Sequence, residues 1–371
     1  MKKIGILTQP LHNNYGGLLQ AFALQSYLKA CGHEVITIDF QFPKPSFSLK
    51  VRGVLSNLYR KYVLKEDVKY IFPLSEQEAN KVSANTRRFR SNYIDVTEMI
   101  DKVSEFHKMD KYEFDAYIVG SDQVWRPIYS PGLEAFYLSF LGDDTTTRRI
   151  SYAASFGTDN CSEYTDSQIE EFAKLTHKFH ALSVREDSGV KLCKDHFGVV
   201  AKHVIDPTML LNKEDYELVI NNSKVPKSPG SLMTYVLDRS EEKLQVIEMV
   251  ADELSLKPFS VLPGSDNIYP PVEQWLRGFV DAEYVVTDSF HGVVFSIIFN
   301  KPFIAVGNAN RGLARFESLL NMFSLKDRLV TGVDDLTKEL INRPIDFEVI
   351  NQIRIGQQNI AGDFINKALY D

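Results

Sequence analysis

Short apolar runs alternate with helix-patterned segments from the first residues of the chain. The run "IGIL" (4–7) predicts a buried strand, and "LLQAFALQSYLKACG" (18–32) has apolar residues at helical spacing with Gly32 as a stop signal. The run "HEVITIDF" (33–40) predicts a second strand. A strand, loop, helix and strand in about 40 residues form a βαβ unit, which indicates a parallel sheet covered by helices.

The alternation continues through two regions that a proline-bearing segment, "SKVPKSPGS" (223–231), separates. Further strands are predicted within 115–120, 149–157, 180–186, 202–207, 232–238, 259–263, 283–288 and 302–307. We predict an N-terminal α/β domain (1–222), a C-terminal α/β domain (228–345) and a helical tail (346–371). The expected fold class is α/β, with two Rossmann-like domains facing each other across a cleft.

Residues 41–112 depart from this rhythm and are predicted to form a helical insertion in the first domain. The segment 41–65 carries six lysines and arginines before the first acidic residue. One interpretation is a solvated helical surface, because charge runs usually face water. The other is a docking surface for an anionic acceptor or for the headgroups of a membrane, with apolar contacts from Phe42, Phe47, Leu55 and Tyr59.

Composition narrows the class of protein. The 371 residues are 44% hydrophobic and 25% charged, which is typical of a soluble globular chain, and the net charge of -7 argues against a nucleic-acid partner. The three cysteines have no spacing typical of a metal site or a disulfide framework, which favours a reducing compartment. The apolar start is too short for a signal peptide and no run is long enough to span a membrane. We expect a cytoplasmic protein, with peripheral contact at the inner face of the membrane as the alternative.

Ligands of parallel α/β sheets bind beyond the carboxyl ends of the strands, so the loops at those ends are the candidate sites. The first is "HNNYGGLLQ" (12–20), where Gly16 and Gly17 at a helix start allow close approach of a ligand to backbone N–H groups. The alternative is a tight turn in which Asn14 caps the helix.

Two further loops carry charged side chains directly after predicted strands. In "GSDQVWRP" (120–127), Asp122 and Arg126 either face the cleft or belong to a capped turn with Trp125 in the core. In "SVREDSG" (183–189), Arg185 ends an apolar strand, where a buried guanidinium needs an anionic partner. That partner is either Glu186 or Asp206 of the chain, or the phosphate or carboxylate of a ligand.

The fourth loop, "TDSFHG" (287–292), places a histidine between two apolar segments. With a strand at 284–287 and a helix at 292–299, His291 lies at a helix N-terminus, where bound anions are favoured. A histidine beside an anionic substrate can act as a general acid. The alternative is a capping histidine that is hydrogen-bonded to Asp288.

Taken together, these loops resemble a known family. The segments "NYGGLLQAFALQSYLKACGHEV", "GSDQVW", "SYAASFG", "SVRED", "DPTMLL" and "TDSFHG" follow the order seen in polysaccharide pyruvyl transferases, in particular the bacterial capsule and exopolysaccharide members. The resemblance spans about residues 4–320 and implies a two-domain fold similar to that of GT-B glycosyltransferases.

The resemblance also implies a reaction. It implies transfer of the enolpyruvyl group of phosphoenolpyruvate to two hydroxyls of a sugar, with release of phosphate. The sugar belongs to a surface polysaccharide or to its precursor, and a lipid-linked oligosaccharide is one form of such a precursor. His291 matches the position of the acid, and we expect Asp288 to orient its ring. Phosphoenolpyruvate is a co-substrate, and neither a metal nor a cofactor is expected.

One position departs from the family pattern. Some members have an arginine two residues before the histidine, which is expected to bind phosphoenolpyruvate, whereas this chain has Ser289. We expect Ser289 to donate a hydrogen bond and either Arg311 or Arg315 to supply the missing charge, while Arg185 matches the second anion-binding arginine of the family.

Two other functions compete with this interpretation. A GT-B glycosyltransferase that uses a nucleotide sugar would share the fold. Many such enzymes carry two glutamates eight residues apart in the second domain, and residues 207–371 contain no such pair. The other alternative is a non-catalytic sugar-binding relative, to which the serine at position 289 gives some weight.

Overall fold

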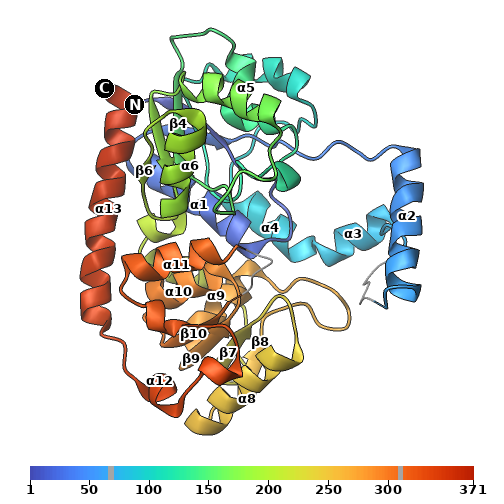
Figure 1. The fold of residues 1–371 in the computed structure, drawn as a ribbon, viewed down its shortest axis with the longest axis vertical. Helices are drawn as coiled ribbons and strands as arrows, with labels where there is room; N and C mark the ends of the chain where they lie inside the picture. The colour runs from blue at the N-terminus through green and yellow to red at the C-terminus, as the bar shows by residue number, and fades with distance from the viewer. Residues whose placement is uncertain (66–70, 308–311) are drawn as a thin grey trace.

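The computed structural model describes residues 1–65, 71–307 and 312–371, and it contains two parallel sheets (Figure 1). The first sheet has the strand order β2-β1-β3-β4-β5-β6. Its strands are β1 (Lys3–Leu7), β2 (Glu34–Thr37), β3 (Ala116–Val119), β4 (Arg148–Ala154), β5 (Ala181–Val184) and β6 (Lys202–His203). All pairings are parallel, as the βαβ pattern predicts.

Helices connect these strands and cover the sheet. They are α1 (Tyr15–Ala30), α5 (Asp166–Thr176), α6 (Asp187–Phe197) and α7 (Lys213–Asn221). Local sequence sets their ends: a capping box of Thr165 and Gln168 begins α5, and Gly198 ends α6 in the left-handed conformation. Short 3-10 helices fill the remaining turns: η2 (Pro127–Tyr129), η3 (Leu133–Tyr137), η4 (Ser139–Leu141), η5 (Pro207–Leu210), η7 (Lys326–Arg328) and η8 (Val333–Asp335).

The second sheet has the order β11-β10-β9-β7-β8. Its strands are β7 (Leu232–Tyr235), β8 (Pro258–Ser260), β9 (Tyr284–Thr287), β10 (Phe303–Val306) and β11 (Leu329–Val330), with helices α8 (Glu241–Leu254), α9 (Val272–Asp281), α10 (Phe290–Ile298), α11 (Leu313–Met322) and α12 (Lys338–Asn342). Every residue of β9 and β10 is buried, which explains why these strands appear in the sequence as unbroken apolar runs. The expected class of two parallel α/β domains is confirmed.

The region 41–112, predicted as a helical insertion, joins β2 to β3. It holds α2 (Phe47–Tyr62), α3 (Glu76–Val82), α4 (Ala84–Tyr93) and the 3-10 helix η1 (Val103–Tyr112). Helix α4 contacts both α1 and α9, so the insertion reaches both halves of the molecule. In Figure 1, α2 stands apart from the two sheets and their helices.

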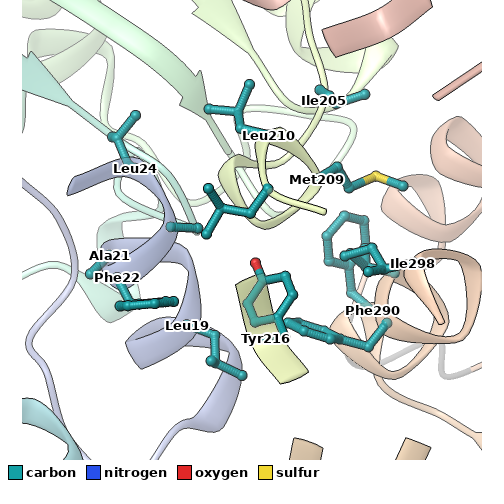
Figure 2. Close-up of a cluster of buried hydrophobic side chains, with 14 of the residues drawn as sticks. Leu19, Ala21, Phe22, Leu24, Ile205, Met209, Leu210, Tyr216, Phe290 and Ile298 are labelled. Atoms are coloured by element: carbon teal, nitrogen blue, oxygen red, sulfur yellow. The ribbon is translucent and has the colours of Figure 1, made fainter. Parts of the chain in front are cut away.

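The two halves share an apolar core, which Figure 2 shows in close-up. Side chains of α1, including Leu19 and Phe22, face Phe290 and Ile298 of α10 across Met209, Leu210 and Tyr216. Because this core joins α1 to α10, it brings the first turns of these two helices together.

The tail is a single helix, α13 (Phe347–Tyr370), which returns from the second sheet to the first (Figure 1). Its Arg354 donates a hydrogen bond from Nη1 to Oδ1 of Asn212 (3.1 Å), and Gln358 donates from Nε2 to the carbonyl oxygen of Met209 (2.8 Å). Among the described residues, no helix combines the length and apolar character that crossing a bilayer requires.

Candidate active site

The N-termini of α1 and α10 meet at the junction of the two domains. Helix α1 follows β1 and α10 follows β9, so both begin at the carboxyl ends of parallel strands. Gly16 lies directly against the His291 ring: a Cβ atom at residue 16 would overlap that ring, well inside the 3.0 Å that real Cβ atoms respect. Glycine at this position therefore permits the close approach of backbone to imidazole.

His291 is buried in the first turn of α10, with 7% of its surface exposed. Its Nε2 atom lies 3.6 Å from Oδ2 of Asp206, which comes from the loop after β6 in the other domain. The two groups form an ion pair when the ring is protonated. The histidine and its carboxylate thus come from opposite sides of the domain junction.

Asp206 is fully buried but well supplied with hydrogen-bond donors. Its Oδ1 accepts from the backbone N–H (3.0 Å) and the hydroxyl (2.7 Å) of Thr208, and its Oδ2 accepts from Arg185 (2.9 Å) and the Ser121 hydroxyl (3.4 Å). Burial by itself raises the pKa of Asp206, but His291, Arg185 and the N–H of Thr208 together hold that pKa well below its usual range. The carboxylate is therefore ionised at neutral pH.

Arg185 is the centre of the ionic contacts. Its Nη1 donates to Asp206, its Nη2 lies 3.4 Å from Oδ1 of Asp122, and its guanidinium carbon is 4.4 Å from the centre of the Phe290 ring. Burial opposes the charge, but Asp206, Asp122 and Glu186 outweigh it and raise the pKa of Arg185. Of the partners considered from sequence, Asp206 is the one hydrogen-bonded to Arg185.

Arg315 approaches the same site from the second domain. It is 7% exposed, in α11, with its guanidinium carbon 6.0 Å from the centre of the Phe290 ring. Burial and the neighbouring Arg185 lower the pKa of Arg315 to about 10, which leaves the group charged at neutral pH. Two guanidinium groups thus flank one phenyl ring. Arg311, the other arginine expected near this position, lies outside the described residues.

Asp288 does not have the position expected for it. Its carboxylate accepts hydrogen bonds from the backbone N–H groups of Leu237 (2.6 Å) and Asp238 (3.1 Å) and from Nζ of Lys243 (2.7 Å). Within the described residues, none of its hydrogen bonds goes to His291. The expectation that Asp288 orients the ring is therefore corrected: Asp206 faces the imidazole, and Asp288 holds the turn after β7.

Ser289 is the residue before the first turn of α10 and is 7% exposed. Its backbone N–H donates to the Thr287 hydroxyl (3.1 Å), and its side chain makes no capping hydrogen bond. Ser289 therefore lies at a helix N-terminus next to His291, a position that favours bound anions.

The remaining predicted residues divide into two groups. Asn14 precedes α1, as expected for a capping position, but its Nδ2 lies 3.5 Å from Oδ2 of Asp122 instead of capping the helix. Gly17 packs against the Asn14 side chain. Arg126, by contrast, is held by Glu163, to which it donates from Nε (3.0 Å) and Nη2 (2.8 Å). The neighbouring Trp125 is fully buried, as the structural alternative predicted.

A cavity of about 990 Å³ opens beside this cluster, between the two domains. Residues of both domains line it, among them Asn13, Asn14, Tyr235, Arg239 and Tyr269. Because Asn14 also contacts Asp122, the cavity reaches the edge of the ionic cluster. Its size and position between two α/β domains suit a small substrate.

Sequence reasoning missed two members of the cluster as site residues. Asp206 was considered only as a structural partner of Arg185, and Phe290 was not considered. The signal for Asp206 was its place in "DPTMLL" at the end of a predicted strand, where carboxylates commonly face a site. Phe290 carried no such signal, because an aromatic residue in a buried helix is usually part of the core.

Comparisons with known proteins identify the fold and the family. The chain is similar in structure to UDP-N-acetylglucosamine 2-epimerase from Rickettsia bellii (TM-score 0.50, 9% identity), with 100% of this chain and 97% of that chain covered. It is also similar to UDP-GlcNAc 2-epimerase from Neisseria meningitidis bound to UDP-GlcNAc (TM-score 0.51, 9% identity, 97% and 94% covered). A search of curated proteins found no match. These likenesses show a GT-B-like fold.

The fold does not by itself assign the chain to a family, but a family model does. The model for polysaccharide pyruvyl transferases matches residues 14–310, which include the loops carrying Gly16, Asp122, Arg185, Asp206 and His291. The resemblance inferred from the ordered motifs is confirmed. The chain belongs to the polysaccharide pyruvyl transferase family.

Proposed function

We propose that the protein transfers the enolpyruvyl group of phosphoenolpyruvate to two hydroxyls of a sugar, forming a pyruvate ketal and releasing phosphate. The acceptor is a bacterial surface polysaccharide or its precursor, as in capsule or exopolysaccharide synthesis, and membership of a transferase family for polysaccharides supports this. Phosphoenolpyruvate is a co-substrate, and we expect the reaction to need neither a metal nor a bound cofactor.

One observation carries the proposal: five sequence motifs that lie far apart in the chain form one series of contacts. Gly16 packs on His291, which faces Asp206. Asp206 accepts from Arg185, Arg185 pairs with Asp122, and Asp122 contacts Asn14 at the interdomain cavity. A purely structural role for each motif does not require all of them to meet at the junction of two domains.

The charges of the cluster suit phosphoenolpyruvate, which carries a phosphate and a carboxylate. Burial, and after it the charge of Arg185, lowers the pKa of Arg315, so the two guanidinium groups repel each other at this site. A bound dianion relieves that repulsion and accepts charge-assisted hydrogen bonds. The N-terminus of α10, with the Ser289 hydroxyl, adds further donors.

His291 is placed to transfer the proton that starts the reaction. Protonated His291 gives a proton to the methylene carbon, which becomes a methyl group, and the adjacent carbon becomes an oxocarbenium-like centre. The first sugar hydroxyl attacks that centre and its proton returns to His291. The bond to phosphate then breaks, the second hydroxyl attacks the same carbon, and its proton leaves with the phosphate. Asp206 forms the ion pair with His291 in its protonated state.

The ionic cluster is buried, so substrate has to enter between the domains. His291, Asp206 and Arg185 are each less than a tenth exposed. We propose that phosphoenolpyruvate enters along the interdomain cavity as the domains separate, and that closure returns Gly16 to the His291 ring. Exclusion of water protects the oxocarbenium-like centre from hydrolysis.

The test uses labelled phosphoenolpyruvate with a panel of sugars and lipid-linked sugar acceptors. We expect phosphate release and, by mass spectrometry, an acceptor that carries a pyruvate ketal; in heavy water its methyl group gains one deuterium. EDTA should leave the rate unchanged. His291→Gln should lower kcat by about 10²- to 10⁴-fold and retain phosphoenolpyruvate binding, as expected for loss of a general acid. Full activity of this variant would disprove the acid role.

The rival function is nucleotide-sugar transfer or conversion, because a structural neighbour binds UDP-GlcNAc. The same acceptor panel separates the two. Release of a nucleoside diphosphate from nucleotide sugars, without phosphate release from phosphoenolpyruvate, would overturn our proposal. Sugar binding without either release would support the non-catalytic alternative.

A further inference from the structure

Helix α2 has an apolar stripe that is largely exposed to solvent. Its apolar residues recur at helical spacing: Phe47, Val51, Val54, Leu55, Leu58, Tyr59 and Tyr62. Val54 and Leu58 are half-buried, whereas Phe47, Leu55 and Tyr62 are 82%, 61% and 67% exposed. A stripe with this spacing normally packs against a core, so its exposure needs an explanation.

The exposure is concentrated in this part of the molecule. Of the 21 exposed large apolar side chains in the described residues, nine lie between 42 and 64. Within the described residues, Asn57 of α2 donates from Nδ2 to the carbonyl oxygen of Ile71 (3.5 Å), which marks the side of the helix that faces the chain. The outer side is therefore a candidate docking surface.

The charge of the segment points to an anionic partner. Residues 42–65 contain six lysines and arginines and no acidic residue, in a protein with a net charge of -7. Helical geometry places exposed Arg52 along one edge of the apolar stripe, next to Tyr59, and exposed Lys61 along the other, next to Val54. Apolar and tyrosine side chains between flanking cations are typical of helices that lie in a membrane interface.

We propose that α2 docks the protein on the surface of an anionic lipid bilayer. The apolar stripe enters the headgroup boundary, while Arg52 and Lys61 pair with lipid phosphates. A second copy of this chain is a poorer occupant. Symmetric pairing of two α2 helices would place cations against cations, because the segment contains no acidic residue to complement them.

Three cavities that share lining residues lie between the docking surface and the candidate site. Leu74 lines both a cavity of about 350 Å³ beside α2 and one of about 750 Å³ beneath α3 and α4. Asn13 lines the latter and also the interdomain cavity. Docking would therefore place the entrance to the site next to the bilayer, where a lipid-linked acceptor resides. Access to a lipid-linked acceptor rests on the proposed function, whereas the docking of α2 on a bilayer does not.

The test is flotation of the full chain with vesicles of phosphatidylglycerol and phosphatidylcholine, compared with pure phosphatidylcholine. We expect binding to the anionic vesicles alone, weakening as salt rises. The variant Leu55→Ser/Tyr59→Ser/Tyr62→Ser should lose binding. Arg52→Gln/Lys61→Gln should weaken it by about 25-fold, from about fivefold per charge near the surface.

A matched control variant separates a specific role of α2 from a general loss of exposed apolar side chains. Leu218→Ser/Val349→Ser/Ile355→Ser removes three exposed apolar side chains elsewhere and should bind as the parent does. Absence of parental binding, equal binding to neutral vesicles, or full binding by the α2 serine variant would overturn the proposal. So would light scattering showing that those α2 substitutions convert an oligomer into a monomer, because α2 would then be a contact between copies. Vesicle binding does not depend on pyruvyl transfer, so the two proposals can fail separately.

Discussion

At the scale of single residues, the buried carboxylates of Asp206 and Asp288 differ in the groups that they pair with. Asp206 is ionised in a fully buried place because Arg185, Thr208 and His291 compensate for the lost water. Asp288 is buried as completely but is satisfied by Lys243 and two backbone N–H groups. Both carboxylates are therefore paired, and their partners distinguish Asp206, which faces His291, from Asp288, which holds a turn.

Removing the Asp206 charge should destabilise the fold and change its response to acid. Because the pKa of Asp206 is depressed, its ionisation stabilises the fold above its usual value of 3.8, and that contribution is lost as pH falls from there toward the folded-state pKa. Asp206→Asn leaves Arg185 without its closest partner and should cost about 3–5 kcal/mol at pH 7. Urea unfolding at several pH values measures both effects.

The difference between parent and Asp206→Asn should shrink as pH falls below about 4. The exposed Asp95→Asn is the control, with an expected change within about 0.5 kcal/mol. A difference that stays constant down to low pH would contradict the assigned ionisation.

The arginines of the second domain should bind the donor. Arg311→Ala/Arg315→Ala should raise the Kd for phosphoenolpyruvate by about 10- to 100-fold, the range for losing a hydrogen bond to a charged group. Calorimetric titration measures it, with Arg343→Ala as a control because that arginine is half exposed and paired at a remote surface. Parental affinity in the double variant would show that neither arginine replaces the family residue at Ser289.

At the scale of helices and strands, the site is made by the first turns of α1 and α10. Both helices follow a buried strand, and glycine at residue 16 allows their first turns to come into contact. Gly17, one residue further along α1, faces the side chain of Asn14 instead, at 3.2 Å from where a Cβ would lie. Adjacent glycines therefore have different neighbours, which allows a direct comparison.

Gly16→Ala should displace His291 and lower kcat by at least about tenfold, because even a small misplacement of an acid is costly. Gly17→Ala is the matched control. Both gain the helix propensity of alanine, but only the first meets the ring, and the flexible Asn14 side chain can move aside. Equal loss of turnover in both variants would show that general crowding of α1, rather than the His291 contact, is responsible.

For the whole molecule, the important feature is that α13 follows the second domain in the chain but packs on the first. Arg354 binds Asn212 after η5, Gln358 binds Met209 within η5, and Phe364 contacts Tyr152 of β4. Together with the shared core of α1 and α10, the helix couples the two domains. That coupling keeps Asp206 and His291 facing each other although they belong to different domains.

Loosening α13 should therefore uncouple the domains. Arg354→Ala/Gln358→Ala removes hydrogen bonds worth about 1 kcal/mol each and should let the first domain unfold at a lower urea concentration than the second. The two tryptophans report on the domains separately: Trp275→Phe leaves Trp125 in the first, and Trp125→Phe leaves Trp275 in the second. Gln352→Ala, at an exposed position of α13, is the control. Coincident midpoints in the α13 variant would contradict the coupling role.

The sequence by itself determined the elements and the motifs. Runs such as "IGIL" and "EYVVTD" became β1 and β9, because a strand buried on both faces requires an unbroken apolar run. Two-residue β11 was missed, because so short a strand has no periodicity to detect. His291, Arg185 and Gly16 could be selected because each breaks a local pattern at the end of a predicted strand.

Only the tertiary structure decided which groups face one another. Asp288 was the obvious partner for His291 because it is three residues away, yet the turn directs it to Lys243, and the ring meets Asp206 from the other domain. Local sequence specifies backbone conformation through steric preference and hydrogen bonding over a few residues. The partner of a buried charge depends instead on how two sheets and their helices pack, and that energy comes from contacts between residues far apart in the chain.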